Sequence, residues 1–286
     1  TFSSIEVNLD MDGSVISQCK FGRQSPCFVG ACFAMFFFST GQLTATLFNA
    51  NAVETESFQG VSSYTFSEDE SKIMISSQSE KIYRRSSKAK FFVYDRKSKQ
   101  VEAVFSEDKI RYATFNPTAD KVAFVYGNNL HYKDLTTGKI VQLTKDGKKN
   151  AIINGATDWV YEEEFALAVG FKWSPDGKHL AFMRFDESGV KEFTMTHYRN
   201  GAYPEYETFK YPKVGEDNAK VSVHIYDLTS GKTVKADTHL DSEHYIPRIR
   251  WTGKDEELCI IRMNRHQSKV ELLLADATTG KTQTLF

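Results

Sequence analysis

Short apolar segments recur along the chain from about residue 60, each separated from the next by polar turn residues. Every repeat opens with an aromatic residue, passes through a small polar turn and continues as a short apolar strand. The opening aromatics are Phe66, Phe115, Trp173 and Trp251. The pattern predicts a chain made of many short β-strands.

Each repeat closes on a second strand and a hairpin turn. The closing segments are Tyr94-Asp95 with Ser98-Lys99, Tyr132-Lys133-Asp134 with Gly138-Lys139, Tyr226-Asp227 with Gly231-Lys232, and Asp276 with Gly280-Lys281. Thr-Gly-Lys or Ser-Gly-Lys between apolar strands is typical of a hairpin loop in which glycine takes a positive φ.

The spacing of the repeats distinguishes two all-β architectures. The opening aromatics are 49, 58 and 78 residues apart, and insertions lengthen the later intervals. Units of about 40 to 50 residues made of short strands are typical of β-propeller blades. A β-sandwich is the alternative, but it would not repeat the same order of elements so regularly. We therefore expect an all-β, partial β-propeller of about four to five blades, with Trp173 and Trp251 packed between blades.

One insertion carries the run Ala156-Thr157-Asp158-Trp159-Val160-Tyr161-Glu162-Glu163-Glu164-Phe165. Asp158 is a good N-cap and good helix formers follow it, so the run predicts a single helical turn that interrupts the strands. Three adjacent glutamates are most often a solvated charge run. Neighbouring helical residues point about 100° apart, however, so two adjacent carboxylates can converge on one cation while three cannot. Such a pair would bind an ammonium group through charge-assisted hydrogen bonds.

A second insertion lies between residues 184 and 220. It contains Tyr203-Pro204-Glu205-Tyr206 and Tyr211-Pro212-Lys213. Two prolines and several tyrosines predict an extended excursion from the blade, suited to a partner or a lid.

The only strongly apolar run extends from Cys27 to Phe38 and is twelve residues long. It is too short to span a bilayer and suits either a buried strand or the core of a signal segment. Its internal position favours a buried strand or a disrupted sequence. We assign no function to residues 1–40.

Composition excludes several classes of protein. Lys plus Arg (36) nearly balance Asp plus Glu (37) in the 286 residues, which does not suggest nucleic-acid binding. The cysteines form no C-x-x-C pair, so zinc binding and thioredoxin-type chemistry are not expected. We also expect no cofactor. A disulfide among the three early cysteines stays open. The cysteines are Cys19, Cys27, Cys32 and Cys259.

The run Asp158–Glu164 resembles the double-glutamate motif of the dipeptidyl peptidase IV family, serine exopeptidases of the prolyl oligopeptidase clan. Tyr211-Pro212-Lys213, with Gly215 and Asn218, is similar to a second family segment in the same relative place. The resemblance extends from Gly41 to Phe286 and is strongest to bacterial members, whereas residues 1–40 match poorly. It implies an eight-bladed propeller followed by an α/β-hydrolase domain, of which 41–286 would form roughly the first half of the propeller.

The resemblance also implies roles for individual residues. In the family the last two glutamates of the motif, here Glu163 and Glu164, grip the free N-terminal amine of the substrate. An arginine from an earlier blade holds a substrate carbonyl, and alignment of Tyr83-Arg84-Arg85-Ser86 favours Arg84, with Arg85 as the alternative. An arginine near two carboxylates would also keep both ionised.

The catalytic residues of that clan are not found in this sequence. No G-x-S-x-G occurs, and the seven histidines show no arrangement typical of a triad or a metal site. We therefore expect the chain to be inactive by itself. It is either the recognition and gating propeller of a dipeptidyl peptidase that releases X-Pro and X-Ala dipeptides, or a stand-alone propeller that binds without catalysis.

If the chain is the recognition propeller of a dipeptidyl peptidase, three kinds of partner are expected. They are peptides with a free N-terminus, the missing blades with the hydrolase domain, and a second copy of the full-length protein. Family habit implies a periplasmic or cell-envelope location.

Overall fold

The computed structural model describes residues 24–29, 32–37, 43–50, 53, 58–199, 201–238 and 243–286. They form two compact units. The first takes its described residues from Thr1–Phe66, Glu70–Ser79 and Ala89–Asp108, and the second contains Ser67–Asp69, Glu80–Lys88 and Lys109–Phe286.

The first unit contains two antiparallel sheets. One has the order β1-β2-β3, and the other has the order β4-β5-β6-β7. Their strands are β1 (Gln24–Val29), β2 (Cys32–Phe37), β3 (Leu43–Asn49), β4 (Ser63–Phe66), β5 (Lys72–Lys81), β6 (Ser87–Asp95) and β7 (Val101–Ala103). The far end of the β5–β6 hairpin, Glu80–Lys88, belongs to the second unit.

Strands β1 and β2 cover most of the apolar run from Cys27 to Phe38. The backbone is thus extended where the sequence allowed a strand or a signal segment. Cys19 and the side chains of Cys27 and Cys32 lie outside the described residues, so the disulfide question stays open.

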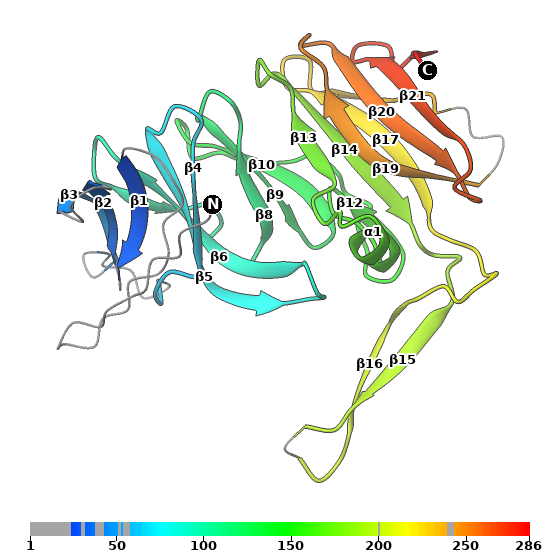
Figure 1. The fold of residues 1–286 in the computed structure, drawn as a ribbon, viewed down its shortest axis with the longest axis horizontal. Helices are drawn as coiled ribbons and strands as arrows, with labels where there is room; N and C mark the ends of the chain where they lie inside the picture. The colour runs from blue at the N-terminus through cyan, green and yellow to red at the C-terminus, as the bar shows by residue number, and fades with distance from the viewer. Residues whose placement is uncertain are drawn as a thin grey trace, which may run out of the picture. The chain divides into compact units, whose positions relative to one another are not determined.

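The second unit contains three further antiparallel sheets of four or five strands (Figure 1). Their orders are β11-β10-β9-β8, then β12-β14-β17-β18 with β13 paired to β14, and β19-β20-β21-β22. The first comprises β8 (Arg111–Phe115), β9 (Lys121–Tyr126), β10 (Asn129–Asp134) and β11 (Ile140–Gln142). The second comprises β12 (Ile152–Asn154), β13 (Phe171–Trp173), β14 (His179–Asp186), β17 (Lys220–Asp227) and β18 (Lys232–Lys235). The third comprises β19 (His244–Trp251), β20 (Glu257–Asn264), β21 (Val270–Asp276) and β22 (Thr282–Thr284).

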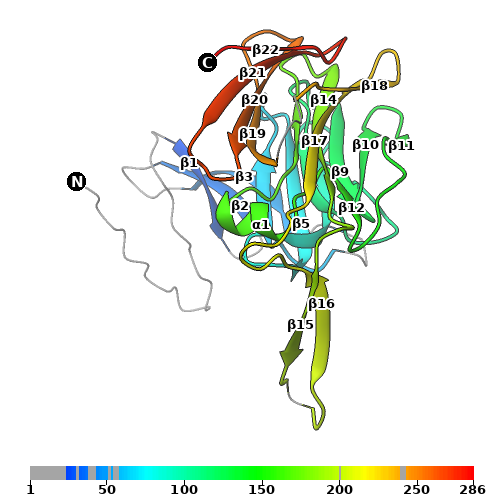
Figure 2. The same ribbon diagram turned by 90° about the vertical axis from the view of Figure 1, so that its right-hand side faces the viewer.

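The second insertion forms a two-stranded arm between β14 and β17. Its strands are β15 (Glu192–His197) and β16 (Glu205–Lys210), which pair only with each other among the described residues. In both views the arm extends away from the sheet that carries it (Figures 1 and 2). The predicted extended excursion is therefore a β-hairpin.

The inner strands of the second unit are buried on both faces. The first five residues of β14 are all buried, as are four consecutive residues of β9. A strand covered on both sides reads as a continuous apolar run, whereas a half-exposed one alternates. One core therefore joins the three sheets, and it includes Val125, Leu130, Phe171, Leu180, Val223, Ile249, Ile260 and Leu273.

Two of the opening aromatics connect successive sheets. The Trp173 indole N–H donates to the Thr114 carbonyl at 3.2 Å, and that of Trp251 donates to the Lys172 carbonyl at 3.0 Å. Each tryptophan thus bonds a strand of the preceding sheet, β8 for Trp173 and β13 for Trp251, which gives the expected packing between blades a specific contact.

The closing turns share one geometry. Gly138, Gly231 and Gly280 have φ values of 72°, 68° and 73°, as the Gly-Lys pattern predicts. Their amides donate to the carbonyls of Asp134, Asp227 and Asp276, each at 2.9 Å. In the β6–β7 turn Lys99 takes the same position with φ 63°. The described residues thus contain four blade-type sheets in chain order and a three-stranded sheet before them, so the fold is the expected all-β partial propeller.

The glutamate run forms the predicted helical turn, α1 (Trp159–Glu164), between β12 and β13. The Asp158 carboxylate caps it by accepting the Tyr161 amide at 3.0 Å. The helix ends at Phe165, whose amide donates to the Tyr161 carbonyl at 3.2 Å. Because Asp158 is buried, desolvation raises its pKa to about 6, although the bond from the Tyr161 amide lowers it.

This shift predicts a pH-dependent stability. A folded-state pKa above the usual 3.8 means that the stability linked to Asp158 is present below about pH 4 and is lost as pH rises through 6. Asn keeps the capping oxygen but cannot ionise. In denaturant unfolding of the full-length protein, Asp158→Asn should therefore be more stable than the parent at pH 8, by on the order of 2 kcal/mol, and equal to it at pH 4.

Asp134 provides a matched control with the opposite sign. Hydrogen bonds from Thr137 hold the pKa of its carboxyl below the usual value. Asp134→Asn should therefore be less stable than the parent at pH 8. An Asp158→Asn variant that is also less stable at pH 8 would contradict the assigned shift.

Candidate functional site

The three glutamates of α1 point to three different environments. Glu162 is only 1% exposed, and its Oε1 accepts the backbone amides of Arg85 at 2.6 Å and Ser86 at 2.8 Å. The helix therefore turns its first glutamate inward, toward the end of the β5–β6 hairpin. Adjacent helical positions differ by about 100°, so the next two glutamates leave that face.

Glu163 lies beside Arg84. Its Oε2 is 3.5 Å from the Arg84 Nε, and the two side chains are 19% and 73% exposed. Glu164 occupies the last helical position and is exposed, with no ion pair to any described residue. The structure thus brings Arg84 and Glu163 together at the end of α1, next to a carboxylate that faces solvent.

The two candidate arginines are now distinguished by their contacts. The Arg84 guanidinium pairs with Glu163, whereas Arg85 contributes its backbone amide to Glu162. Of the two arginines, Arg84 is the one whose side chain contacts a glutamate. A role of Glu163, Glu164 or Arg84 in substrate binding stays a prediction at this stage.

The turn that presents Arg84 is closed by its own hydrogen bonds. The amides of Ile82 and Tyr83 donate to the carbonyl and the hydroxyl of Ser86, both at 3.0 Å. The Tyr112 hydroxyl also bonds to the Ser86 side chain. Burial raises the pKa of Tyr83 and of Tyr112 to about 12, so both phenols stay neutral at physiological pH.

Rings from three segments pack beside this turn. Trp159 of α1 lies 4.3 Å from Tyr211, Tyr211 lies 5.5 Å from Phe193, and Phe209 lies 5.8 Å from Tyr83, measured between ring centroids. These contacts join the helix, the base of the arm and the arginine turn. Sequence reasoning missed them, because it placed Tyr211 in the extended insertion and in the family-like segment but gave it no packing partner.

Glu187, at the start of the arm insertion, is a further buried acid. Burial raises the pKa of its carboxyl to about 7, and the nearby Asp158 carboxylate adds to the shift. Lys210 and Arg111 oppose it. The sequence offered no signal for this shift, because it depends on which residues surround the carboxyl in space.

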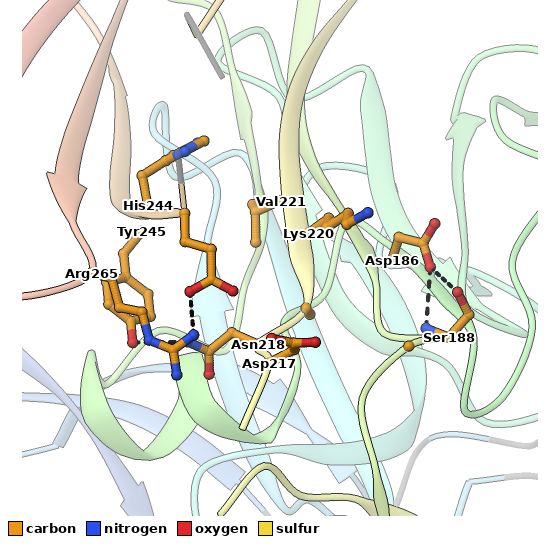
Figure 3. Close-up of a pocket in the computed structure, with 12 residues that line it drawn as sticks. Asp186, Ser188, Asp217, Asn218, Lys220, Val221, His244, Tyr245 and Arg265 are labelled. Carbon is orange, nitrogen blue, oxygen red and sulfur yellow. Dashed lines mark hydrogen bonds and ion pairs between the residues drawn. The ribbon is translucent and has the colours of Figure 1, made fainter. Parts of the chain in front are cut away.

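A separate cavity of about 640 Å³ is lined by residues of β14, β17 and β19 and the loops next to them. Arg265, His244 and Tyr245 line one side and Asp186 with Ser188 the other (Figure 3). The Asn218 amide donates to the Tyr245 hydroxyl at 3.0 Å. Asn218, part of the family-like segment, therefore lies in the cavity wall.

Tyr245 of the cavity wall also packs against residues of the helix and its C-terminal end. The Tyr245 ring lies 5.3 Å from the Phe165 ring and 6.2 Å from the Tyr161 ring. Arg265, which pairs with Glu243, also donates to the Glu216 carbonyl at 2.6 Å. The lining is of mixed charge, and three of its charged groups, Asp186, Glu243 and Arg265, already have protein partners.

The described part of the chain contains no group of three or more His, Cys, Asp or Glu residues that could hold a metal ion. No helix within it is both long and apolar enough to cross a membrane.

Comparison with known proteins gives consistent matches. Residues 46–286 match the family model described as "Dipeptidyl peptidase IV (DPP IV) N-terminal region". The chain is 32% identical over 236 residues to "Probable dipeptidyl-aminopeptidase B" of Chaetomium globosum, covering 76% of this chain and 25% of that protein. The corresponding protein of Phaeosphaeria nodorum is also 32% identical over 236 residues, with 76% and 26% covered. The chain thus spans about a quarter of the length of the curated relatives it matches.

A solved structure agrees with these matches. The crystal structure of Porphyromonas gingivalis dipeptidyl peptidase 4 superposes with a TM-score of 0.86 at 33% identity, covering 94% of this chain and 39% of that one. The match to the family model extends over most of the chain. The chain therefore belongs to the dipeptidyl peptidase IV family and corresponds to the N-terminal region of its members.

Proposed function

We propose that this chain is the substrate-recognition and gating propeller of a dipeptidyl peptidase that releases X-Pro and X-Ala dipeptides from peptide N-termini. The observation that carries the proposal is the Arg84–Glu163 pair beside the exposed Glu164. The catalytic Ser, Asp and His belong to a hydrolase domain of the full-length protein.

The two carboxylates have the chemistry that an N-terminal amine requires. An ammonium group has three N–H donors, and charge-assisted bonds to two carboxylates satisfy two of them. Arg84 lies beside Glu163 before substrate arrives. Its guanidinium has five donors, so it can bond Glu163 and a substrate carbonyl together.

Recognition of the amine explains cleavage after the second residue. Because the glutamates hold the substrate amine at a fixed distance from the nucleophile, only the peptide bond after the second residue can reach the nucleophile. A bound peptide with a blocked or internal amine would exclude water from Glu164 without giving it a partner, which costs several kcal/mol. Selection would therefore depend on the free N-terminus.

Removal of either charge tests the clamp. Glu163→Gln and Glu164→Gln in the full-length protein should each lower kcat/KM for an X-Pro substrate by about 100-fold or more, because a neutral amide binds an ammonium group weakly. Steady-state hydrolysis of an X-Pro chromogenic substrate measures the loss. The exposed Glu107 provides a control, and Glu107→Gln should leave the rate unchanged.

Two results would argue against this function. Unchanged kcat/KM in both variants would remove the amine clamp. A full-length protein that binds X-Pro peptides through these glutamates yet releases no dipeptide would instead be a propeller-type binding module.

The arm suggests how two copies of the full-length protein associate. Its exposed tyrosines Tyr198, Tyr203 and Tyr206 have 84%, 86% and 69% of their surface exposed. Large rings gathered on one hairpin are typical of an interaction surface. The proposed partner is the arm region of a second copy, which gives a homodimer.

Polar substitution on the arm should separate the dimer. Tyr203→Ser with Tyr206→Ser removes two exposed rings, and sedimentation of the full-length protein should shift from dimer to monomer. Val214→Ser, which changes an exposed residue beyond β16, should leave the sedimentation unchanged. A double variant that still sediments as a dimer would place the contact elsewhere.

The location follows from family habit. Bacterial relatives are exported to the cell envelope, and the proposed substrates are peptides met there. Fractionation of the source cells should therefore recover the full-length protein with the envelope or periplasm. Recovery with cytosolic markers would contradict the proposal.

A further inference from the structure

The first glutamate of the run has a different task from its two neighbours. Glu162 is buried, and one of its oxygens accepts two successive backbone amides, those of Arg85 and Ser86. These amides directly follow Arg84 in the chain. The contact therefore ties the backbone next to Arg84 to the helix that carries Glu163.

Among the described residues, the Arg84 side chain forms one ion pair and no further hydrogen bond. It is 73% exposed, and its ion pair with Glu163 spans 3.5 Å. Exposed ion pairs of this kind contribute little, because solvent screens them and two long side chains must be ordered. The position of the guanidinium must therefore come mainly from the backbone of the turn.

Glu162 is well suited to hold that backbone. Bonds from amides to an ionised acceptor are stronger than neutral ones, and Ser86 is 1% exposed, so solvent does not compete for its amide. The internal bonds of the turn use the carbonyl and hydroxyl of Ser86 and not its amide. Without Glu162, a buried donor would lack this acceptor.

We infer that Glu162 is a positioning residue for substrate recognition, which fixes the turn 82–86 on α1 so that Arg84 stays beside Glu163. The inference rests on the proposed function, in which Arg84 and Glu163 contact the substrate. A small misplacement of such a group reduces the rate strongly, since catalysis depends on orientation. Glu162 itself does not contact the substrate.

A double-mutant cycle tests this role in the full-length protein. Glu162→Ala should lower kcat/KM for an X-Pro chromogenic substrate by about 10- to 100-fold. In an Arg84→Ala background the same change should have almost no further effect, because the residue it positions is gone. Glu162→Gln keeps an oxygen acceptor and should retain activity within about threefold of the parent.

Two further variants separate positioning from loss of folding. Glu162→Asp keeps the charge but withdraws the carboxylate by one methylene, so it should reproduce most of the loss if Glu162→Ala does not fold. Tyr161→Phe removes the hydroxyl that accepts the Ile246 amide at 2.8 Å and loosens α1 on its other side. The kcat/KM losses of Tyr161→Phe and Arg84→Ala should therefore multiply in the double variant.

Amide hydrogen exchange supplies a readout independent of turnover. The Arg85 and Ser86 amides should exchange faster in Glu162→Ala than in the parent. The Tyr83 amide should keep its protection, because it donates to the Ser86 hydroxyl. Unchanged exchange at Arg85 and Ser86 would overturn the anchoring role.

The kinetic outcomes distinguish the two proposals. If the kcat/KM losses of Glu162→Ala and Arg84→Ala multiply in the double variant, the positioning role is overturned and the amine clamp is unaffected. An Arg84→Ala variant with full activity would overturn the proposed use of Arg84, and the positioning role with it. Equal losses in Glu162→Gln and Glu162→Ala would also refute anchoring by the acceptor oxygen.

Discussion

The candidate site depends on the tertiary anchoring of one short helix. Six residues are too few for a helix to be stable alone, because nucleation costs more than a few backbone bonds return. Helix α1 is held on one side by the Tyr161 hydroxyl, which accepts the Ile246 amide, and on the other by Glu162. Its cap, Asp158, is buried as well. The glutamates point in defined directions because the helix cannot turn between these contacts.

Three adjacent carboxylates would repel one another if they shared one environment. The helix separates them, since Glu162 binds backbone amides, Glu163 lies beside Arg84, and Glu164 faces solvent. Each charge is thus stabilised in its own way. The arrangement leaves hydrogen-bonding capacity on Glu163 and Glu164, which is what an incoming cation needs.

The blade framework explains why such an insertion is tolerated. The sheets of the second unit pack through buried central strands, and Trp173 and Trp251 bond the preceding sheets. The arm takes no part in these contacts, since β15 and β16 pair only with each other among the described residues. The segment that carries α1, in contrast, contributes Val160 and Tyr161 to the core, so the blade itself anchors the recognition helix.

Much of this was readable from the sequence because it is local. The aromatic-turn-strand repeat predicted the blade sheets, the Gly-Lys turns predicted positive φ at Gly138, Gly231 and Gly280, and Asp158 predicted the start of the helix. The two insertions were also visible, since they interrupt a regular spacing. Helical geometry alone indicated that one of the three glutamates must leave the others.

What the sequence could not decide depends on distant residues. That Glu162 is the one turned inward follows from the Arg85 and Ser86 amides, more than 70 positions earlier in the chain. The raised pKa of Glu187 depends on burial and on the nearby Asp158 charge. By itself the sequence determined periodicity, turns and the cap, because these arise between neighbours. Only the tertiary structure decided which charges meet, because burial and hydrogen bonding join residues that the chain keeps far apart.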